Sequence, residues 1–208
     1  MFDELVKFFV VLLVVVEPLS LLPVLAGLTD GADNNYRRRM SLKAIAISSV
    51  VCLVFAAAGT ALLKVLGISV DAFKVGGGIL LFLLAIEMVF ARPSGVRSIT
   101  PGEDAEAHHR GDISVFPLAF PLIAGPGAIA TILLAFAGVP PGSLQFFAQV
   151  GVIVLVLAIT LALMLVTGPV MRVIGVTGGA VLGRLLGVLL AALASQFVLD
   201  GIRGAMAS

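Results

Sequence analysis

The chain has 208 residues, of which 60% are hydrophobic and only 12% are charged, and its net charge is +1. A soluble domain is about 45–50% apolar and about 25% charged, so this composition excludes an ordinary water-soluble domain. The small net charge gives no reason to expect a nucleic-acid partner, and the single cysteine, Cys52, excludes an internal disulfide.

The apolar residues form six blocks, each with about the 20 residues needed to cross a lipid bilayer. A bilayer offers no water to open backbone groups, and the blocks lack the alternation of barrel strands. We therefore expect an all-α, polytopic protein of the plasma (inner) membrane with six transmembrane helices. The blocks are 5–29, 41–66, 72–91, 114–137, 146–171 and 179–202. The intervening breaks are expected at 30–35, 67–69, 92–112, 139–142 and 175–178.

The first block is predicted to be a retained span that is broken near its middle. Its start is acidic, unlike that of a signal peptide, and no clear cleavage site follows. Glu17-Pro18 and Pro23 interrupt the helix, because proline lacks an N–H donor and clashes with the preceding turn. A charge at the depth of Glu17 is costly, so this carboxyl should face the interior, be paired or be protonated. It would bind a substrate ammonium or carry a coupling proton; the alternative is a neutral, hydrogen-bonded carboxyl in a kink.

The fourth block is interrupted in a comparable way by Pro117, Pro121 and then Gly125-Pro126-Gly127. Corresponding interruptions in two halves of a transporter indicate a binding site near the middle of the membrane. A half-helix that begins near Ala128 would direct free N–H groups and a positive dipole end towards a carboxylate.

The other polar groups of the two broken helices suit the opposite charge. Unwound carbonyls around Pro18 and Gly125 would accept hydrogen bonds from an ammonium group or a cation, and Ser20 and Thr131 add hydroxyls. A small zwitterion, such as an amino acid, needs both kinds of helix end. The alternative is that the prolines only kink packed helices.

Basic residues favour one orientation in the membrane. If both termini lie outside, eight basic residues fall on the inner side and four on the outer side, in agreement with the positive-inside rule. The inner group is Arg37, Arg38, Arg39, Lys43, Arg92, Arg97, Arg110 and Arg172, and the outer group is Lys7, Lys64, Lys74 and Arg203.

An internal repeat organises the chain into one transmembrane domain, 1–208. Residues 62–69 match residues 170–177 at every position by identity or conservative replacement, with a shift of 108 that also places Pro18 on Pro126. We expect repeat one at 1–91, a cytoplasmic linker at 92–112 and repeat two at 113–208. Three spans in each half would relate the repeats by inverted topology, a common plan of secondary transporters.

These landmarks also carry a resemblance. They are Glu17-Pro18 through Pro23, Gly67-Ile68-Ser69 with Gly76-Gly77-Gly78, Phe116-Pro117-Leu118-Ala119, Ala124-Gly125-Pro126-Gly127, and Gln196-Phe197 to Asp200-Gly201-Ile202. With them the chain resembles the MarC family of integral membrane proteins over essentially its whole length. One branch of that family is associated with transport of glycine and alanine. The resemblance implies binding positions at Pro18, Ser20, Pro23, Gly125, Pro126, Gly127 and Thr131. Glu17, where relatives often have Asp or Asn, and Leu19-Ser20, where they have a small glycine, depart from the pattern.

The expected function is therefore secondary transport of small neutral amino acids, coupled to protons or sodium and without a cofactor. The alternatives are an exporter of another drug or metabolite, a non-transporting membrane scaffold and an intramembrane enzyme. An enzyme is disfavoured because no reactive pair lies at membrane depth. Adjacent His108 and His109 in the linker are more consistent with solvation than with a metal site. The sequence leaves the oligomeric state open.

Overall fold

The computed structural model describes residues 2–90 and 112–207, apart from the side chains of 173–177 and 180. Every regular element in these ranges is helical, which confirms the predicted all-α class. In chain order the elements are α1 (Phe2–Val16), α2 (Pro18–Leu28), α3 (Asn34–Val65), α4 (Val70–Phe90), η1 (Ser114–Ile123), α6 (Pro126–Phe136), α7 (Leu144–Leu165) and α8 (Thr167–Ala207). The predicted linker, 92–112, lies almost wholly outside the described residues, as do His108 and His109.

Five described helical segments are long and apolar enough to cross a membrane, and a sixth span results if one bent pair is counted as a unit. The five are Phe2–Leu28, Asn34–Val65, Val70–Phe90, Leu144–Leu165 and Val181–Ala207. The bent pair is Ser114–Ile123 with Pro126–Phe136, whose axes differ by 53°. The shortest of the five has 21 residues, which at about 1.5 Å per residue matches the roughly 30 Å hydrocarbon core.

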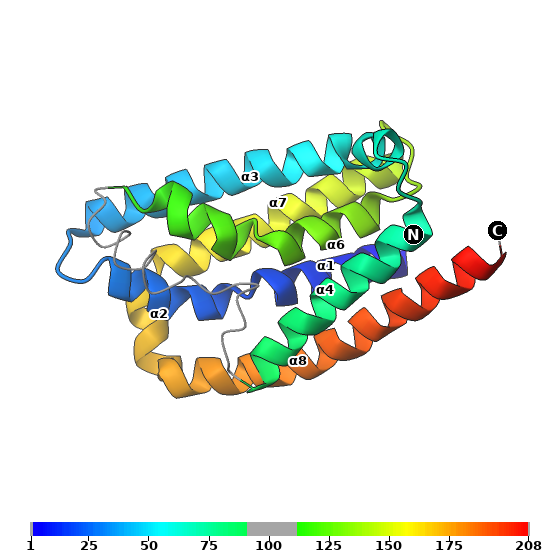
Figure 1. The fold of residues 1–208 in the computed structure, drawn as a ribbon. Helices are drawn as coiled ribbons and strands as arrows, with labels where there is room; N and C mark the ends of the chain where they lie inside the picture. Colours follow the sequence, from blue (N-terminus) through cyan, green and yellow to red (C-terminus); the bar gives the residue numbers. More distant parts are fainter. Residues whose placement is uncertain (1, 91–111, 208) are drawn as a thin grey trace.

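Both ends of the chain lie at the same end of the molecule (Figure 1). We call this end, where α1 begins and α8 finishes, the terminal end, and the opposite end, where α3 and η1 begin, the linker end. The arginines at the start of α3 lie at the linker end, whereas Lys64 and Arg203 lie at the terminal end. The described members of the two predicted groups of basic residues are thus separated between the ends of the bundle, whereas Arg92, Arg97 and Arg110 lie outside the described residues.

The α1–α2 segment forms the centre of the bundle. Of its most apolar 18-residue window, 61% is buried, against 22–33% for the other four spans. In Figure 1 it runs between a layer of α3, α7 and α6 and the long pair of α4 and α8. The α1–α2 segment therefore contacts helices on both sides of the bundle.

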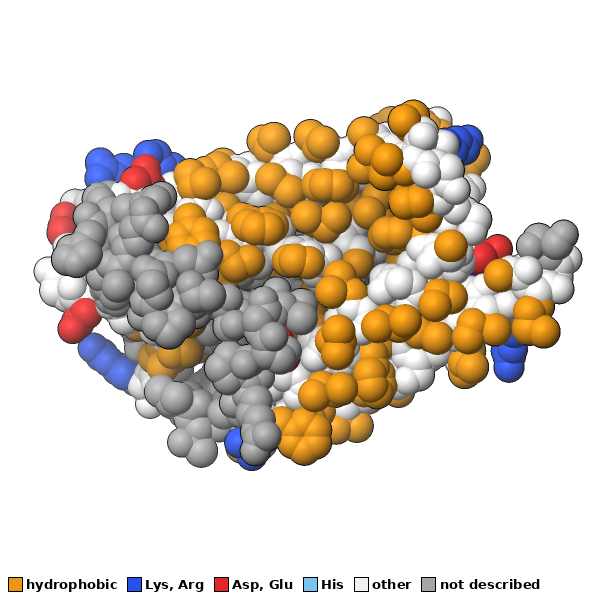
Figure 2. Space-filling view, viewed as in Figure 1, with side chains coloured by type: hydrophobic (Ala, Val, Ile, Leu, Met, Phe, Trp, Pro, Cys, Tyr) orange, Lys and Arg blue, Asp and Glu red, His pale blue; other side chains and the backbone are white. Residues whose placement is uncertain are grey.

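The surface fits a lipid environment. Figure 2 shows hydrophobic side chains spread over the middle of the molecule, with charged side chains gathered towards its ends. Large apolar side chains are exposed along the outer helices, including Val54, Phe82, Val154 and Leu185. Such an extensive apolar surface is unfavourable in water and favourable against acyl chains.

Two predicted boundaries differ from the structure. The expected break at 175–178 is wrong: α7 ends at Leu165 and α8 runs without interruption from Thr167 to Ala207. The physical reason is Pro169, which is tolerated in the first turn of a helix but would clash inside one, so the chain breaks just before it. In addition, α3 begins at Asn34 rather than near 41, because a helix continues beyond the apolar core into the headgroup region, where polar side chains are solvated.

Candidate functional site

The first span is interrupted at Glu17, as predicted. Glu17 adopts a left-handed conformation with φ 48° and ψ 63°, the one positive φ among the described non-glycine residues. Its N–H still donates to the Leu13 carbonyl (2.9 Å), and its own carbonyl accepts from the Ser20 N–H (3.1 Å). Pro18 opens α2 because a proline at the first helical position needs no N–H partner. The two halves remain a single span with an irregular centre.

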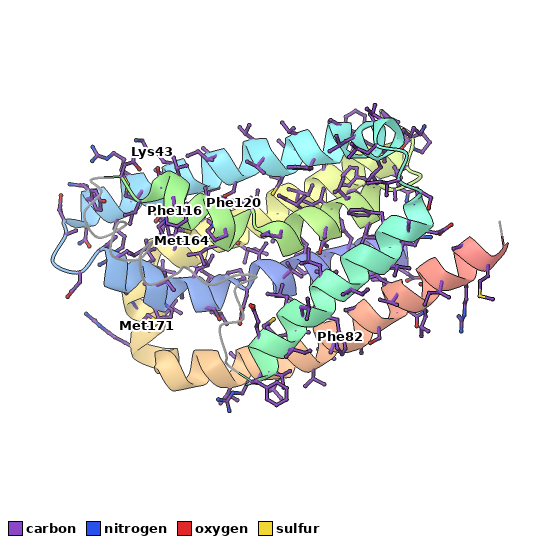
Figure 3. All side chains as sticks on the ribbon, viewed as in Figure 1. Lys43, Phe82, Phe116, Phe120, Met164 and Met171 are labelled. Carbon is purple, nitrogen blue, oxygen red and sulfur yellow. The ribbon has the colours of Figure 1, made fainter. Side chains whose placement is uncertain are left out.

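The fourth span is interrupted more strongly. In η1, Phe116 and Phe120 have extended backbones and precede Pro117 and Pro121 through cis peptide bonds; both phenylalanines are labelled in Figure 3. Gly125 is then extended and Pro126 opens α6.

The start of α6 is buried in the bundle. Gly127 and Ala128 are both buried, and the Ile129 N–H donates to the Gly125 carbonyl (3.0 Å). The first N–H groups of a helix have no partner within that helix, so a partial positive charge lies here in the interior.

The two interruptions lie beside one another. A Cβ built on Gly127 would be 2.9 Å from Leu84 of α4 and 3.0 Å from Val15 of α1, two residues before Glu17. A cavity of about 10 Å³ lies at this junction, lined by Val15, Leu84, Pro121–Ile123 and Gly125–Ala128. That volume holds about one water molecule. The junction is therefore closed to any larger solute in this conformation.

The Glu17 carboxyl group faces α8. Glu17 is 8% exposed, and a Cβ on Gly183 of α8 would be 2.6 Å from Glu17 Oε1. A carboxyl at membrane depth is expected to avoid lipid, and the structure agrees with that expectation. It does not place Glu17 among the residues that line the small cavity.

The remaining predicted positions are divided. Gly125, Pro126 and Gly127 come together at the cavity, and Pro18 is buried at the start of α2. Thr131 is buried one turn into α6, where its hydroxyl donates to the Gly127 carbonyl (2.8 Å). Ser20 and Pro23 are half-buried in α2, and neither lines a described cavity.

Comparisons with known proteins identify the family. A model of the MarC family of integral membrane proteins matches residues 2–206. The chain is 33% identical to the inner membrane protein YhgN of Escherichia coli, over 97% of each chain, and 32% identical to the membrane protein YvbG of Bacillus subtilis, over 98% of this chain and 96% of the relative. A membrane protein of Methanocaldococcus jannaschii is 35% identical over 92% of each chain. This chain belongs to the MarC family. No solved structure matches it.

Membership settles the bilayer as the environment of this MarC protein and confirms the resemblance that the landmarks indicated. Among the described residues, no group of three or more His, Cys, Asp and Glu side chains is arranged to hold a metal ion.

Sequence reasoning missed a second, larger cavity. It has a volume of about 260 Å³ at the terminal end, between the start of α1, the end of α6, the start of α7 and Phe197 of α8. Two of its polar lining residues are buried, Thr131 (2% exposed) and Gln149 (3% exposed). The available indication in the sequence was Gln149, an amide inside the mainly apolar α7 segment.

Proposed function

We propose that this MarC protein is a secondary transporter of small neutral amino acids, such as glycine and alanine, which bind where the first and fourth spans are interrupted. The observation that carries the proposal is the meeting of the two interruptions: α6 begins inside the bundle at Pro126, and its second residue, Gly127, lies against Val15 in the last turn of α1. Transporters use such discontinuous helices to bind substrates near the middle of the membrane.

The start of α6 and the neighbouring Glu17 carboxyl, two residues after Val15, together offer a zwitterion both signs of charge. The buried first turn of α6 offers N–H groups and a positive dipole end to a carboxylate. Glu17, in its ionised form, would attract an ammonium group, and protonation of the same carboxyl would couple transport to protons; sodium is the alternative coupling ion. Pro18, Ser20, Pro23, Gly125, Pro126 and Thr131 are proposed to complete the site.

An inverted repeat would supply the movement. Pro126 follows Pro18 by 108 residues, and α2 and α6 each contain 11 residues and begin with these prolines. This correspondence supports two halves, 1–91 and 113–208, that rock against each other. The small junction cavity accepts no amino acid, so substrate entry requires the start of α6 to separate from α1 and α4. We place the protein in the inner membrane, as YhgN is named, with both termini outside.

Uptake of radiolabelled glycine and alanine into proteoliposomes tests the proposal, with and without a pH or sodium gradient. We expect saturable uptake that Glu17→Gln reduces at least tenfold. Glu87→Gln is the matched control, because Glu87 is also a buried carboxyl (9% exposed) but lies within the unbroken helix α4 rather than at an interruption.

The same assay separates the competing functions. Equal uptake by Glu17→Gln and Glu87→Gln would show that Glu17 is not part of the binding site. The absence of uptake by folded protein under every gradient would refute the amino-acid proposal and favour an exporter of another solute, a scaffold or an intramembrane enzyme.

A further inference from the structure

The larger cavity is lined by Gln149, whose side-chain oxygen is a buried hydrogen-bond acceptor without a donor among the described residues. The Gln149 Nε2 group donates to the Ala135 carbonyl in the last turn of α6 (3.0 Å). The Gln149 Oε1 atom is buried and, within the described part of the chain, accepts no hydrogen bond. Buried polar atoms almost always have a partner, so this oxygen calls for a donor that enters the cavity.

The other polar groups deep in the cavity are also acceptors. The only hydroxyl hydrogen of Thr131 is donated to Gly127, so the oxygen presents lone pairs to its surroundings. The last turn of α6 lines the same cavity through Leu134, Ala135 and Ala137. The end of a helix carries a partial negative charge, which favours a cation.

The mouth of the cavity carries one charge of each sign. The Lys7 ammonium lies over the Phe197 ring, 4.9 Å from its centroid, and Glu4 accepts from Gln145 Nε2 at 3.4 Å. The charges of Lys7 and Glu4 offset one another, so they do not oppose the preference for a cation that the buried acceptors create. The remaining wall is apolar, formed by Phe8, Val11, Leu134 and Val139.

We propose that this cavity binds a small organic molecule through a protonated primary amino group, with Gln149 Oε1 as the principal acceptor. The hydrocarbon part of the ligand lies against the apolar wall. Size favours such a molecule over a bare metal cation, because a cavity of about 260 Å³ has room for many water molecules.

The cavity lies farther along α6 than the proposed transport junction, and Thr131 borders both sites. The small junction cavity is lined by the first turn of α6, up to Ala128, whereas the larger cavity is lined by Thr131, Leu134 and Ala135. Gln149 and Lys7 line the larger cavity alone. A simple amine and an amino acid share the required ammonium group, and Lys7 would select the amino acid through its carboxylate.

Isothermal titration of the purified protein tests this inference with propylamine, alanine and propionate at pH 7. We expect saturable binding of propylamine and none of propionate. Gln149→Leu should weaken amine binding at least tenfold, whereas Gln196→Leu should not, because Gln196 is an exposed amide that bonds to Asp200 on α8. Alanine binding that depends on both Gln149 and Lys7 would identify an amino acid as the ligand, and propylamine binding alone would identify an amine.

A second variant distinguishes loss of the amide from misfolding of the protein. Val139→Phe, in the loop after α6, fills the cavity without changing the amide, and it should abolish amine binding while elution as a single species is retained. Binding of propionate as strong as that of propylamine, amine binding that survives both variants, or displacement by sodium but not potassium would overturn the inference.

The transport proposal and the cavity proposal can be refuted independently of one another. Glu17→Gln should leave amine binding intact, and amine binding without amino-acid uptake would refute transport alone. Amino-acid uptake without amine binding would refute this cavity site alone.

Discussion

Gly183 of α8 lies directly against the Glu17 carboxyl group at the interruption of the first span, where a Cβ at position 183 would stand 2.6 Å from Oε1. The missing side chain therefore provides the space that the carboxyl group occupies. The carboxyl group is the end of a flexible side chain. Its position therefore depends on the size of the residue at position 183 of α8.

Gly183→Ala should move the Glu17 carboxyl group without unfolding the protein. The new methyl group displaces the end of a flexible side chain rather than backbone, and alanine favours a helix by about 1 kcal/mol over glycine. We expect amino-acid uptake to fall at least fivefold, with a melting temperature within a few degrees of the wild type. Gly179→Ala is the control, since nothing described lies within 4 Å of its added Cβ. Equal uptake by the two variants would contradict a role for this contact.

Gly78→Ala should separate α4 from α8, which make the most extensive helix contact in the structure. The added Cβ would be 2.8 Å from Val198 Cγ2 and 2.9 Å from the Ala194 carbonyl oxygen. Backbone cannot move aside as a side chain can, so overpacking should cost about 1–3 kcal/mol. Gly76→Ala, two residues earlier, meets nothing within 4 Å and should be neutral or slightly stabilising. Thermal unfolding of both variants in detergent measures the difference, and equal melting temperatures would refute close packing at Gly78.

The interruptions of the two spans were predictable because their cause is local. Pro18 and Pro126 lack the N–H that would bond to the preceding turn, and each opens a new helix. The same rule, applied to Pro169, would have placed the start of α8 correctly. The predicted interruption at Pro23 is wrong, because Pro23 lies inside α2 and the helix continues to Leu28; a spanning helix tolerates one missing backbone bond where its neighbours satisfy the freed carbonyl. The Gly175–Gly178 segment was misleading, because two glycines in a long apolar helix weaken it without ending it.

The contacts between distant segments were not predictable. Nothing local links Glu17 to Gly183, or Gln149 to Ala135, since each pair depends on which helices become neighbours. Thr131 illustrates the same limit: its bond to Gly127 is local to α6, but its position beside the larger cavity emerges only from the folded bundle.

Gly125→Ala should destabilise the protein more than Gly183→Ala or Gly78→Ala does. The φ of Gly125 is ordinary, at −76°, so the requirement is space rather than conformation. Its Cβ would overlap the Pro121 carbonyl oxygen, which is backbone. We expect a loss of more than about 2 kcal/mol, seen as a large drop in melting temperature or in yield of monodisperse protein. Gly27→Ala, on α2 with open space around its Cβ, should behave as the wild type does.

The ion pair between Lys43 and Asp112 should make stability depend on pH. Lys43 Nζ lies 2.7 Å from Asp112 Oδ2 and ties the start of η1 to α3 at the linker end, where Lys43 is labelled in Figure 3. The Lys43 ammonium, followed by the hydroxyl and N–H of Ser114, holds the pKa of Asp112 well below its usual range. A carboxyl whose pKa is lowered by folding stabilises the protein above the unfolded value of about 3.9, and this contribution is lost as the pH falls below it.

Asp112→Asn should therefore lower the melting temperature at pH 7 and have a diminishing effect as the pH falls from 5 to 3. Because the two side chains are 51% and 45% exposed, solvent screening limits the contribution to at most about 1 kcal/mol. Lys43→Met should reproduce the loss, and the double variant should lose little more than either single variant, since both remove the same ion pair.

Melting curves of all four proteins across this pH range test the coupling. A difference between wild type and Asp112→Asn that stays constant down to pH 3, or fully additive losses in the double variant, would show that the pair does not stabilise the junction of η1 with α3.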